Sequence, residues 1–460
     1  MKTNASKKIV SWVAVMTTLV AAAVAQQKPA TDKPDANIAS AMQKVSPTTL
    51  KADDEKLVTF HSRQTLSSVI PAESGRGINA AAKWIESQFG EYSKACGGCL
   101  EVKTDEFTQE PGERVPKPTK LTNVYAILKG TDPDSAKRIV LMSGHYDSRC
   151  SETNDYECAS PGANDDGSGT IAVLEAARVL SRHKFPATII FLTVAGEEQG
   201  LYGSKHFAKT AKDQGWNIEA VLSNDIVGGD KSPGQDPTKV RVFSEGIPLA
   251  ATPQDLRFIR AIGGENDSPS RQLARYIRSV GDTYFQGENF GPVMIYRQDR
   301  YLRGGDHTSF NSEGFAAVRM TEWRENYNHQ HQTLRTENGI EYGDLPKFVD
   351  FNYVANVTRL NVAALASLAS APAPPAHVRL LTKELVNDST LQWDASLDNR
   401  VASYEVLWRD TDWPFWTSEK NVGKATTVTL PISKDNVIFG VRTLDAEGHR
   451  SLVVTPVPAR

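Results

Sequence analysis

Between about residues 55 and 370, short apolar segments alternate with segments of helical periodicity. The 167–183 segment, for example, carries apolar residues at i, i+3, i+4 and i+7, the spacing of one helix face. Strands that alternate with helices of this length indicate βαβ units. The sequence therefore predicts an α/β domain with a mostly parallel mixed sheet flanked by helices. The predicted elements are strands at 123–128, 138–142, 187–194 and 220–226, and helices at 78–92, 167–183 and 202–212.

Acidic residues and a histidine lie at predicted strand ends or in the loops after them. In sheets of this kind, sites form just beyond the carboxyl ends of the strands. Any one of these residues alone would more often be an ordinary polar residue, a helix cap or a surface acid. Together, they indicate a metal cluster with imidazole and carboxylate ligands. The residues are His145 and Asp147 in SGHYDS, Asp165 and Asp166 in PGANDDGSG, Glu197 and Glu198 in AGEEQG, and Asp225 in SNDI.

Glu197 and Glu198 are adjacent at the end of an apolar strand. Because neighbouring like charges repel, something must compensate for the arrangement. A cation bound to one of the two carboxylates would do so and would leave the other free for proton transfer.

Four segments in this order, GHYDS, PGANDDGSG, AGEEQGLYGS and NDIVG, resemble the M28 family of zinc-dependent exopeptidases over about residues 55–370. The resemblance implies two zinc ions. His145 and Asp225 would bind one ion, Glu198 would bind the other, and Asp165 would bridge them. Asp147 would orient the His145 ring. Glu197 would be the general base that takes a proton from water and passes it to the leaving amine.

The family also has a late histidine ligand, commonly followed four residues on by Asp. The candidates are His329 and His331, and neither has that Asp. Thr333, four residues after His329, can hydrogen-bond an imidazole, whereas Arg335, after His331, would repel a bound cation. The pattern slightly favours His329, and both remain candidates. His307 lies in a segment that resembles the family's D-H-x-x-F stretch, which implies a contact with the substrate carbonyl or oxyanion.

The resemblance implies a zinc aminopeptidase that acts on peptide N-termini. A carboxypeptidase or a glutaminyl cyclase on the same fold is the alternative. A non-catalytic, receptor-like binding protein is a third possibility, which the intact ligand set argues against. Cobalt or manganese could occupy the same ligands. The sequence carries no readable code for side-chain specificity.

The N-terminus has the three parts of a secretory signal. Basic residues precede an apolar run at 9–25, which ends in Ala-Val-Ala. We therefore expect a signal peptide at 1–25 and a secreted or periplasmic protein, with an uncleaved membrane anchor as the alternative. No later stretch is long and apolar enough to span a bilayer. Residues 26–54 are polar and predict a loose linker or a propeptide-like segment.

The four cysteines are consistent with export. Local pairing is favoured among the three possible arrangements, with disulfides Cys96–Cys99 and Cys150–Cys158. A zinc knuckle or a redox CxxC is the alternative for the CGGC segment.

A Pro/Ala stretch at 371–376 predicts a semi-rigid linker. The segments beyond it alternate apolar and polar residues between turn-like residues, which predicts a small all-β sandwich at 377–460. This part resembles a fibronectin type III module and is a candidate for binding a surface or substrate. The net charge of −3 gives no indication of a nucleic-acid partner or a membrane-binding basic face.

Overall fold

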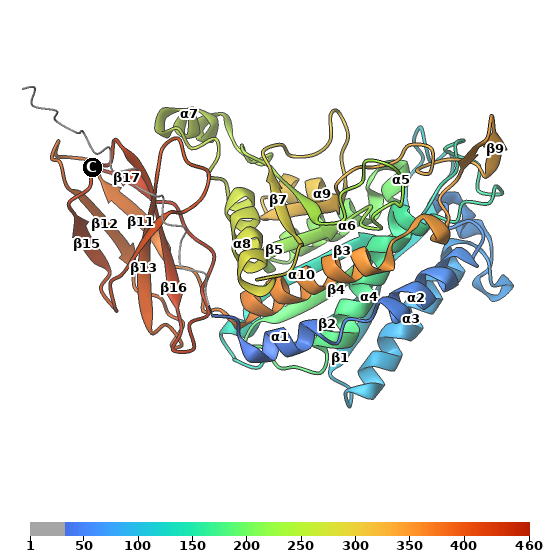
Figure 1. Cartoon of the computed structure of the whole chain (residues 1–460), viewed down its shortest axis with the longest axis horizontal. Helices are drawn as coiled ribbons and strands as arrows, with labels where there is room; N and C mark the ends of the chain where they lie inside the picture. The colour runs from blue at the N-terminus through green and yellow to red at the C-terminus, as the bar shows by residue number, and fades with distance from the viewer. Residues whose placement is uncertain (1–32) are drawn as a thin grey trace, which may run out of the picture.

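A mixed sheet of eight strands forms the centre of the larger domain (Figure 1). The computed structural model describes residues 33–460, so the predicted signal peptide lies outside the described residues. The pairs β4–β3, β3–β5, β5–β8 and β6–β7 are parallel, and β1–β2, β2–β4 and β8–β6 are antiparallel. The predicted fold class is confirmed. In spatial order the strands are β1 (Leu100–Gln109), β2 (Thr119–Leu128), β4 (Thr188–Val194), β3 (Arg138–His145), β5 (Asn217–Asn224), β8 (Ala317–Glu322), β6 (Lys239–Ser244) and β7 (Gly291–Ile295).

Helices cover both faces of this sheet. Every residue of β4 is buried, as is typical of a central strand with packed layers on both sides. One face carries α3 (Gly77–Ala95), α4 (Gly169–Leu180), α8 (Pro269–Tyr284) and the long α10 (Phe351–Ser370). The other carries α6 (Tyr202–Asp213) and α9 (Asp306–Ser312) over a smaller apolar cluster that includes Phe207 and Phe310. The short α7 (Pro253–Ile262) and the hairpin of β9 (Arg335–Glu337) and β10 (Ile340–Tyr342) project from the domain.

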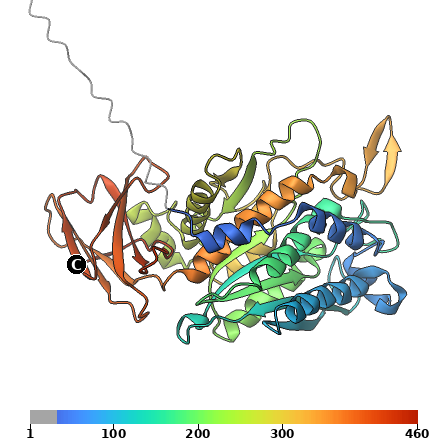
Figure 2. The same ribbon diagram turned by 60° about the horizontal axis from the view of Figure 1, so that its bottom comes forward.

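The structure differs from the expected loose linker at the N-terminus. Residues 36–58 form two helices, α1 (Ala36–Met42) and α2 (Pro47–Val58), which lie against α10 (Figure 2). Leu50 and Leu57 are completely buried. The apolar residues of α1 and α2 are sparse among polar ones, so hydrophobic periodicity did not reveal these helices. The capping residue Ser46 followed by Pro47 is the local signal for the start of α2.

The C-terminal part consists of two β-sheets, as predicted for an all-β module. Apolar residues of both sheets, including Trp393 and Phe439, form one separate core. The module lies at the end of the molecule opposite the β9–β10 hairpin (Figure 1). One sheet contains β15 (Thr427–Leu430), β12 (Ser389–Asp394), β11 (Ala376–Leu381) and β17 (Val457–Ala459), and the other β14 (Ser418–Asn421), β13 (Ser403–Asp410) and β16 (Val437–Leu444).

Both predicted disulfides, Cys96–Cys99 and Cys150–Cys158, are formed. Among the helices of residues 33–460, none combines the length and apolar character that a bilayer crossing requires.

Candidate metal centre

The predicted ligands lie at the carboxyl ends of adjacent strands. His145 is the last residue of β3, and Asp225 directly follows β5. Glu197 and Glu198 begin α5 (Glu197–Gly200), a single turn after β4. Asp165 lies in the irregular helical turn η4 (Ala163–Ser168), which leads into α4. Because β4, β3 and β5 are neighbours, these residues meet at one edge of the sheet, as predicted.

The side chains form two groups that share Asp165. In the first group, His145 Nε2 lies 3.3 Å from Asp165 Oδ1 and 3.9 Å from Asp225 Oδ1. In the second, His331 Nε2 lies 2.9 Å from both Asp165 Oδ2 and Glu198 Oε2. Asp165 therefore presents one carboxylate oxygen to each group, as a carboxylate that bridges two ions would.

Both groups have the composition and the unused bonding capacity of metal sites. Across residues 33–460, His145 Nε2 and Glu198 Oε1 are among the buried polar atoms with no hydrogen-bond partner. Several carboxylates buried together are costly unless a cation compensates their charge. One imidazole and two carboxylates in each group form a donor set that suits zinc. The residues therefore fit a pair of zinc ions.

Asp147 supports parts of both groups. Its Oδ1 accepts the backbone N–H of Glu197 at 3.2 Å, and its Oδ2 accepts that of Glu198 at 3.1 Å. The Nδ1 of His145 lies 3.4 Å from Asp147 Oδ1 and 3.2 Å from the Asp147 carbonyl. Such contacts fix the orientation of a metal-binding ring. Asp147 is thus placed to orient His145, as predicted, and it also anchors the turn that begins with Glu197.

A cavity of about 720 Å³ opens over the two groups, and Glu197 is part of its lining. Glu197 Oε2 lies 4.0 Å from His145 Nε2. Burial raises the pKa of the Glu197 carboxyl well above its usual range, the positive charge of His145 opposes this rise, and the negative charges of Asp225 and Glu198 add to it. A carboxyl group whose charged form is disfavoured in this way is suited to accept and return a proton.

Asp166 holds the first group together through the backbone. It accepts the N–H groups of His145 at 3.0 Å, Gly169 at 2.9 Å and Ile226 at 3.2 Å. These bonds connect the end of β3, the start of α4 and the loop after β5. The sequence indicated only a possible helix cap, and the bond to Gly169 is of that type.

Asp344 is a supporting residue that the sequence analysis missed. Its two carboxylate oxygens accept the backbone N–H groups of Asn164 at 2.8 Å and Asp165 at 2.7 Å. Burial raises the pKa of Asp344 to about 7. No local pattern marks this residue, because its partners are about 180 positions away.

His331, and not His329, belongs to the second group. The Nδ1 of His329 pairs with Asp230, and its ring stacks on Phe348 with the ring centroids 3.6 Å apart. The slight preference for His329 is therefore wrong. That preference relied on the residue four positions further on, whereas the actual partner of His329 comes from a distant loop.

His307 does not reach the cavity. It is completely buried, and its Nε2 donates to the carbonyl of Gln298 at 2.9 Å and lies 3.6 Å from Asp299 Oδ2. Burial lowers the pKa of His307, which keeps the ring neutral near pH 7. The predicted substrate contact is wrong for this structure. His307 supports the loop that leads into α9.

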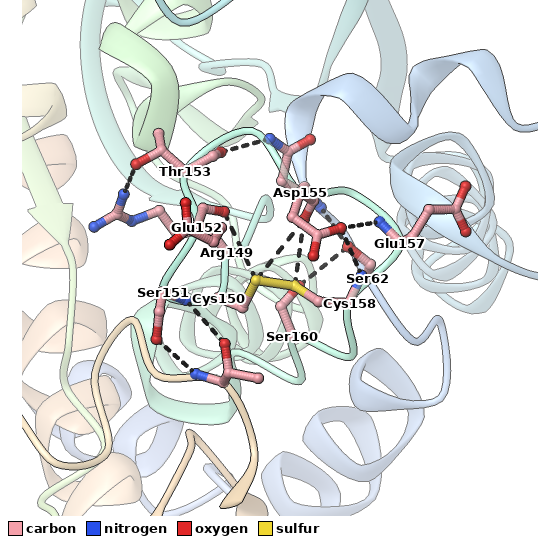
Figure 3. The surroundings of a disulfide bond; sticks show 12 residues. Ser62, Arg149, Cys150, Ser151, Glu152, Thr153, Asp155, Glu157, Cys158 and Ser160 are labelled. Atoms are coloured by element: carbon pink, nitrogen blue, oxygen red, sulfur yellow. Dashed lines mark hydrogen bonds between the residues drawn. A yellow bond between two sulfur atoms is a disulfide. The ribbon is translucent and has the colours of Figure 1, made fainter.

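Cys150 and Cys158 close a short loop by their disulfide bond (Figure 3). Ser151 in this loop lines the cavity, and its Oγ accepts the N–H of Thr333 at 3.0 Å. The disulfide loop is thereby connected to the segment that carries His331.

Arg149 lies directly before this disulfide loop and faces the second group. Its Nη1 donates to the Thr153 hydroxyl at 2.6 Å (Figure 3). Its Nη2 lies 3.0 Å from His331 Nδ1, and its Nε lies 3.4 Å from Glu198 Oε2. The His145 ring thus has a carboxylate beside its Nδ1, whereas the His331 ring has a guanidinium there.

Comparison with known proteins identifies the family. Residues 123–350 match peptidase family M28. A protein of Pyrenophora teres f. teres (strain 0-1) named "Probable zinc metalloprotease" is 45% identical over 431 residues, which cover 93% of this chain and 88% of that protein. A similarly named protein of Leptosphaeria maculans is 44% identical over 428 residues, covering 92% and 98%. The chain therefore belongs to peptidase family M28.

Solved structures share the fold. The Legionella pneumophila LapA aminopeptidase matches with a TM-score of 0.51 and 22% identity, covering 75% of this chain and 78% of that one. An aminopeptidase from Aneurinibacillus sp. strain AM-1 matches with a TM-score of 0.50 and 14% identity, covering 73% and 97%. At these identities the comparison supports the sheet and its flanking helices, and not a particular substrate.

Proposed function

We propose that this chain is an exported zinc peptidase that removes N-terminal residues from peptides by using two zinc ions. The observation that carries the proposal is the position of Asp165 between His145 at 3.3 Å and His331 at 2.9 Å. The first ion would be held by His145, Asp165 and Asp225, and the second by Asp165, Glu198 and His331. When bound, zinc supplies Lewis-acid polarisation of the substrate carbonyl and lowers the pKa of water.

Glu197 is the proposed general base. Its backbone N–H is held by Asp147, while its carboxyl group belongs to the cavity lining. In this position, Oε2 can take a proton from water at the scissile carbonyl and return it to the leaving amine. Burial raises the pKa of Glu197 and the neighbouring acids add to this rise, which favours the uptake of a proton.

Aminopeptidase activity and export are two further parts of the proposal. The names of the LapA and Aneurinibacillus proteins support aminopeptidase activity rather than another peptidase specificity. The two disulfides support export to an oxidising compartment. The prediction of a signal peptide at 1–25 is consistent with both disulfides.

The test compares the purified protein with Glu197→Gln and with Glu91→Gln, a control on the exposed side of α3. Zinc content is measured, and hydrolysis of aminoacyl nitroanilides is assayed. We expect about two zinc ions in all three proteins and loss of activity by about 10²–10⁴-fold in Glu197→Gln only. Full activity of Glu197→Gln, or a wild-type protein that binds no zinc, would refute the proposal.

A further inference from the structure

The cavity over the two metal groups is polar and rich in arginine. Besides the acids of the metal centre, four arginines line it: Arg114, Arg149, Arg300 and Arg303. Within the described chain, Leu201 is the one aliphatic side chain of the lining. A pocket that selects large apolar side chains is expected to be lined mainly by apolar residues. This lining instead suits a substrate group that is negatively charged.

One of the four arginines forms an ion pair with an acid of the cavity lining. Arg149 Nε lies 3.4 Å from Glu198 Oε2. Among residues 33–460, Arg114, Arg300 and Arg303 have no ion pair with Asp165, Glu197, Glu198 or Asp225. The charge of these three guanidinium groups is left to residues outside the cavity lining or to the substrate.

Residues outside the cavity offset only part of this charge. The carboxylate of Glu325 is shared by three arginines, with N–O distances of 3.1 Å from Arg241, 3.0 Å from Arg300 and 2.9 Å from Arg303. Arg300 has a second acid, Asp299, at 2.9 Å. Three positive charges therefore face two negative ones. Arg300 pairs with both acids, whereas Arg303 pairs with Glu325 and shares it with two other arginines.

Arg303 is the arginine of this cluster with bonding capacity to spare. Among the described residues, the bond from Nη1 to Glu325 is the one hydrogen bond of its side chain. The guanidinium carbon also lies 5.9 Å from the centroid of the Tyr327 ring, and 31% of the side chain is exposed. A guanidinium group stays protonated at any pH at which the protein is folded. Arg303 is therefore a permanent cation close to the metal centre.

Arg114 lies on the same cavity but comes from the loop between β1 and β2. Its one hydrogen bond in the described chain runs from Nη1 to the carbonyl of Glu198, at 3.3 Å. It has no ion pair among residues 33–460. Arg149, by contrast, already faces Glu198 and His331, so it belongs to the metal centre and is a poor choice for testing substrate binding.

We propose that Arg303 and Arg114 bind a carboxylate of the substrate and that this site prefers peptides with such a group close to the scissile bond. The inference rests on the proposed peptidase function. A guanidinium group matches a carboxylate with two parallel N–H donors, which a neutral amide cannot replace. The carboxylate could belong to a Glu or Asp side chain, or to the C-terminus of a short peptide.

The experiment uses three pairs of peptides that differ only in one charge. The first pair has Glu or Gln as the N-terminal residue of a peptide amide, the second has Glu or Gln at the next position, and the third is a dipeptide with a free or amidated C-terminus. The measured quantity is the ratio of kcat/KM for the acidic and the neutral member. We expect a ratio of about ten or more in at least one pair, the effect of one charge-assisted hydrogen bond. The pair that responds identifies the source of the carboxylate.

Two cavity variants and one control complete the design. Arg303→Gln and Arg114→Gln should each reduce the ratio severalfold while changing kcat/KM for the neutral peptide less. Arg257→Gln, on the exposed side of α7, should leave the ratio unchanged. A ratio near one or below in all three pairs, or a high ratio that both cavity variants retain, would overturn the inference.

A binding measurement separates this inference from the proposed function. Calorimetric titration of the zinc-loaded Glu197→Gln protein with the same pairs reports recognition without turnover. Cleavage of neutral peptides without a preference for acidic ones would refute the inference and leave the proposed function intact. Absence of cleavage by the wild-type protein, with acidic peptides still bound through Arg303, would refute the peptidase function alone. Equal binding of both members of every pair would overturn the inference.

Discussion

Arg63 offers a direct test of how the N-terminal segment supports the metal centre. Its side chain is 1% exposed. The guanidinium group donates to the carbonyls of Tyr146 at 2.6 Å, Pro161 at 2.5 Å and Gly162 at 2.8 Å. Tyr146 directly follows the histidine of the first group, and Gly162 lies three residues before Asp165. One side chain therefore connects the two segments that deliver these ligands. Arg63→Met removes these three bonds together with a longer one, of 3.4 Å, to the carbonyl of Leu57.

The expected cost follows from these bonds. Hydrogen bonds from a charged donor contribute about 1.5–3 kcal/mol each, so the three short ones set an upper range of about 4.5–9 kcal/mol. Loss of one partner from a buried charged network typically costs about 3–5 kcal/mol. We expect about 4 kcal/mol for Arg63→Met. With an unfolding entropy of about 2.1 cal/mol/K per residue over roughly 430 residues, this corresponds to a decrease in Tm of about 4–5 °C.

Calorimetry of Arg63→Met, with zinc titration into the metal-free protein, measures both consequences. Zinc affinity should fall by about 10–100-fold, as is usual when the residues behind metal ligands are altered. Arg63→Lys should recover part of the loss, because it keeps the charge but has a single donor group. Arg76→Met, an exposed substitution in the same segment, should change neither quantity. If Arg63→Met has the Tm and zinc affinity of the wild type, water satisfies these carbonyls and the reasoning is refuted.

Three further predictions concern pH, a disulfide and the second ion. Burial raises the pKa of Glu245 to about 7, so its contribution to stability is present below about pH 4.5 and is lost as pH rises through 7. In urea unfolding, Glu245→Gln should therefore be more stable than the wild type at pH 8, by at most about 3 kcal/mol, and nearly as stable as the wild type at pH 4.5. Equal stability of the two proteins at pH 8 would contradict this prediction. Replacement of Cys150 and Cys158 by Ala should lower the free energy of unfolding by about 2.5 kcal/mol, because the disulfide closes a nine-residue loop. An unchanged midpoint of urea unfolding would contradict this prediction. A His331 ring that binds zinc through Nε2 carries its proton on Nδ1, and this proton would face an N–H donor of Arg149. Removal of that donor in Arg149→Met should therefore make the second ion bind severalfold more tightly in calorimetry. Weaker binding would contradict the prediction.

The parts of the fold that periodicity determines could be predicted from the sequence. The helix expected at 78–92 is α3 (Gly77–Ala95), and the strand expected at 187–194 is β4 (Thr188–Val194). The antiparallel connection of β6 to β8 and the packing of α1 depend on contacts between distant segments, which no local pattern records.

In the candidate site, too, some residues could be predicted from local sequence and others could not. His145, Asp165, Glu198 and Asp225 could be found because each lies at a recognisable strand end or helix start, in a segment that resembles the family. The choice between the two late histidines required the third dimension, because the partner of His329 is 99 positions away. Asp344 and Arg63 were missed because they act on backbone groups of the ligand segments. Such roles leave no residue pattern of their own.

The C-terminal module is joined to the larger domain by buried charges rather than by a free tether. Arg409 donates to both carboxylate oxygens of Asp267 at 2.8 Å, and Arg275 donates to the same acid at 3.1 Å. These side chains are at most 7% exposed, and Ala371 in the predicted linker is completely buried. Separation of the module from the domain would leave buried charges without their partners, which is costly in free energy. The module and the domain are therefore held as one unit. Any surface that the module binds would consequently hold the arginine-lined cavity in a fixed orientation.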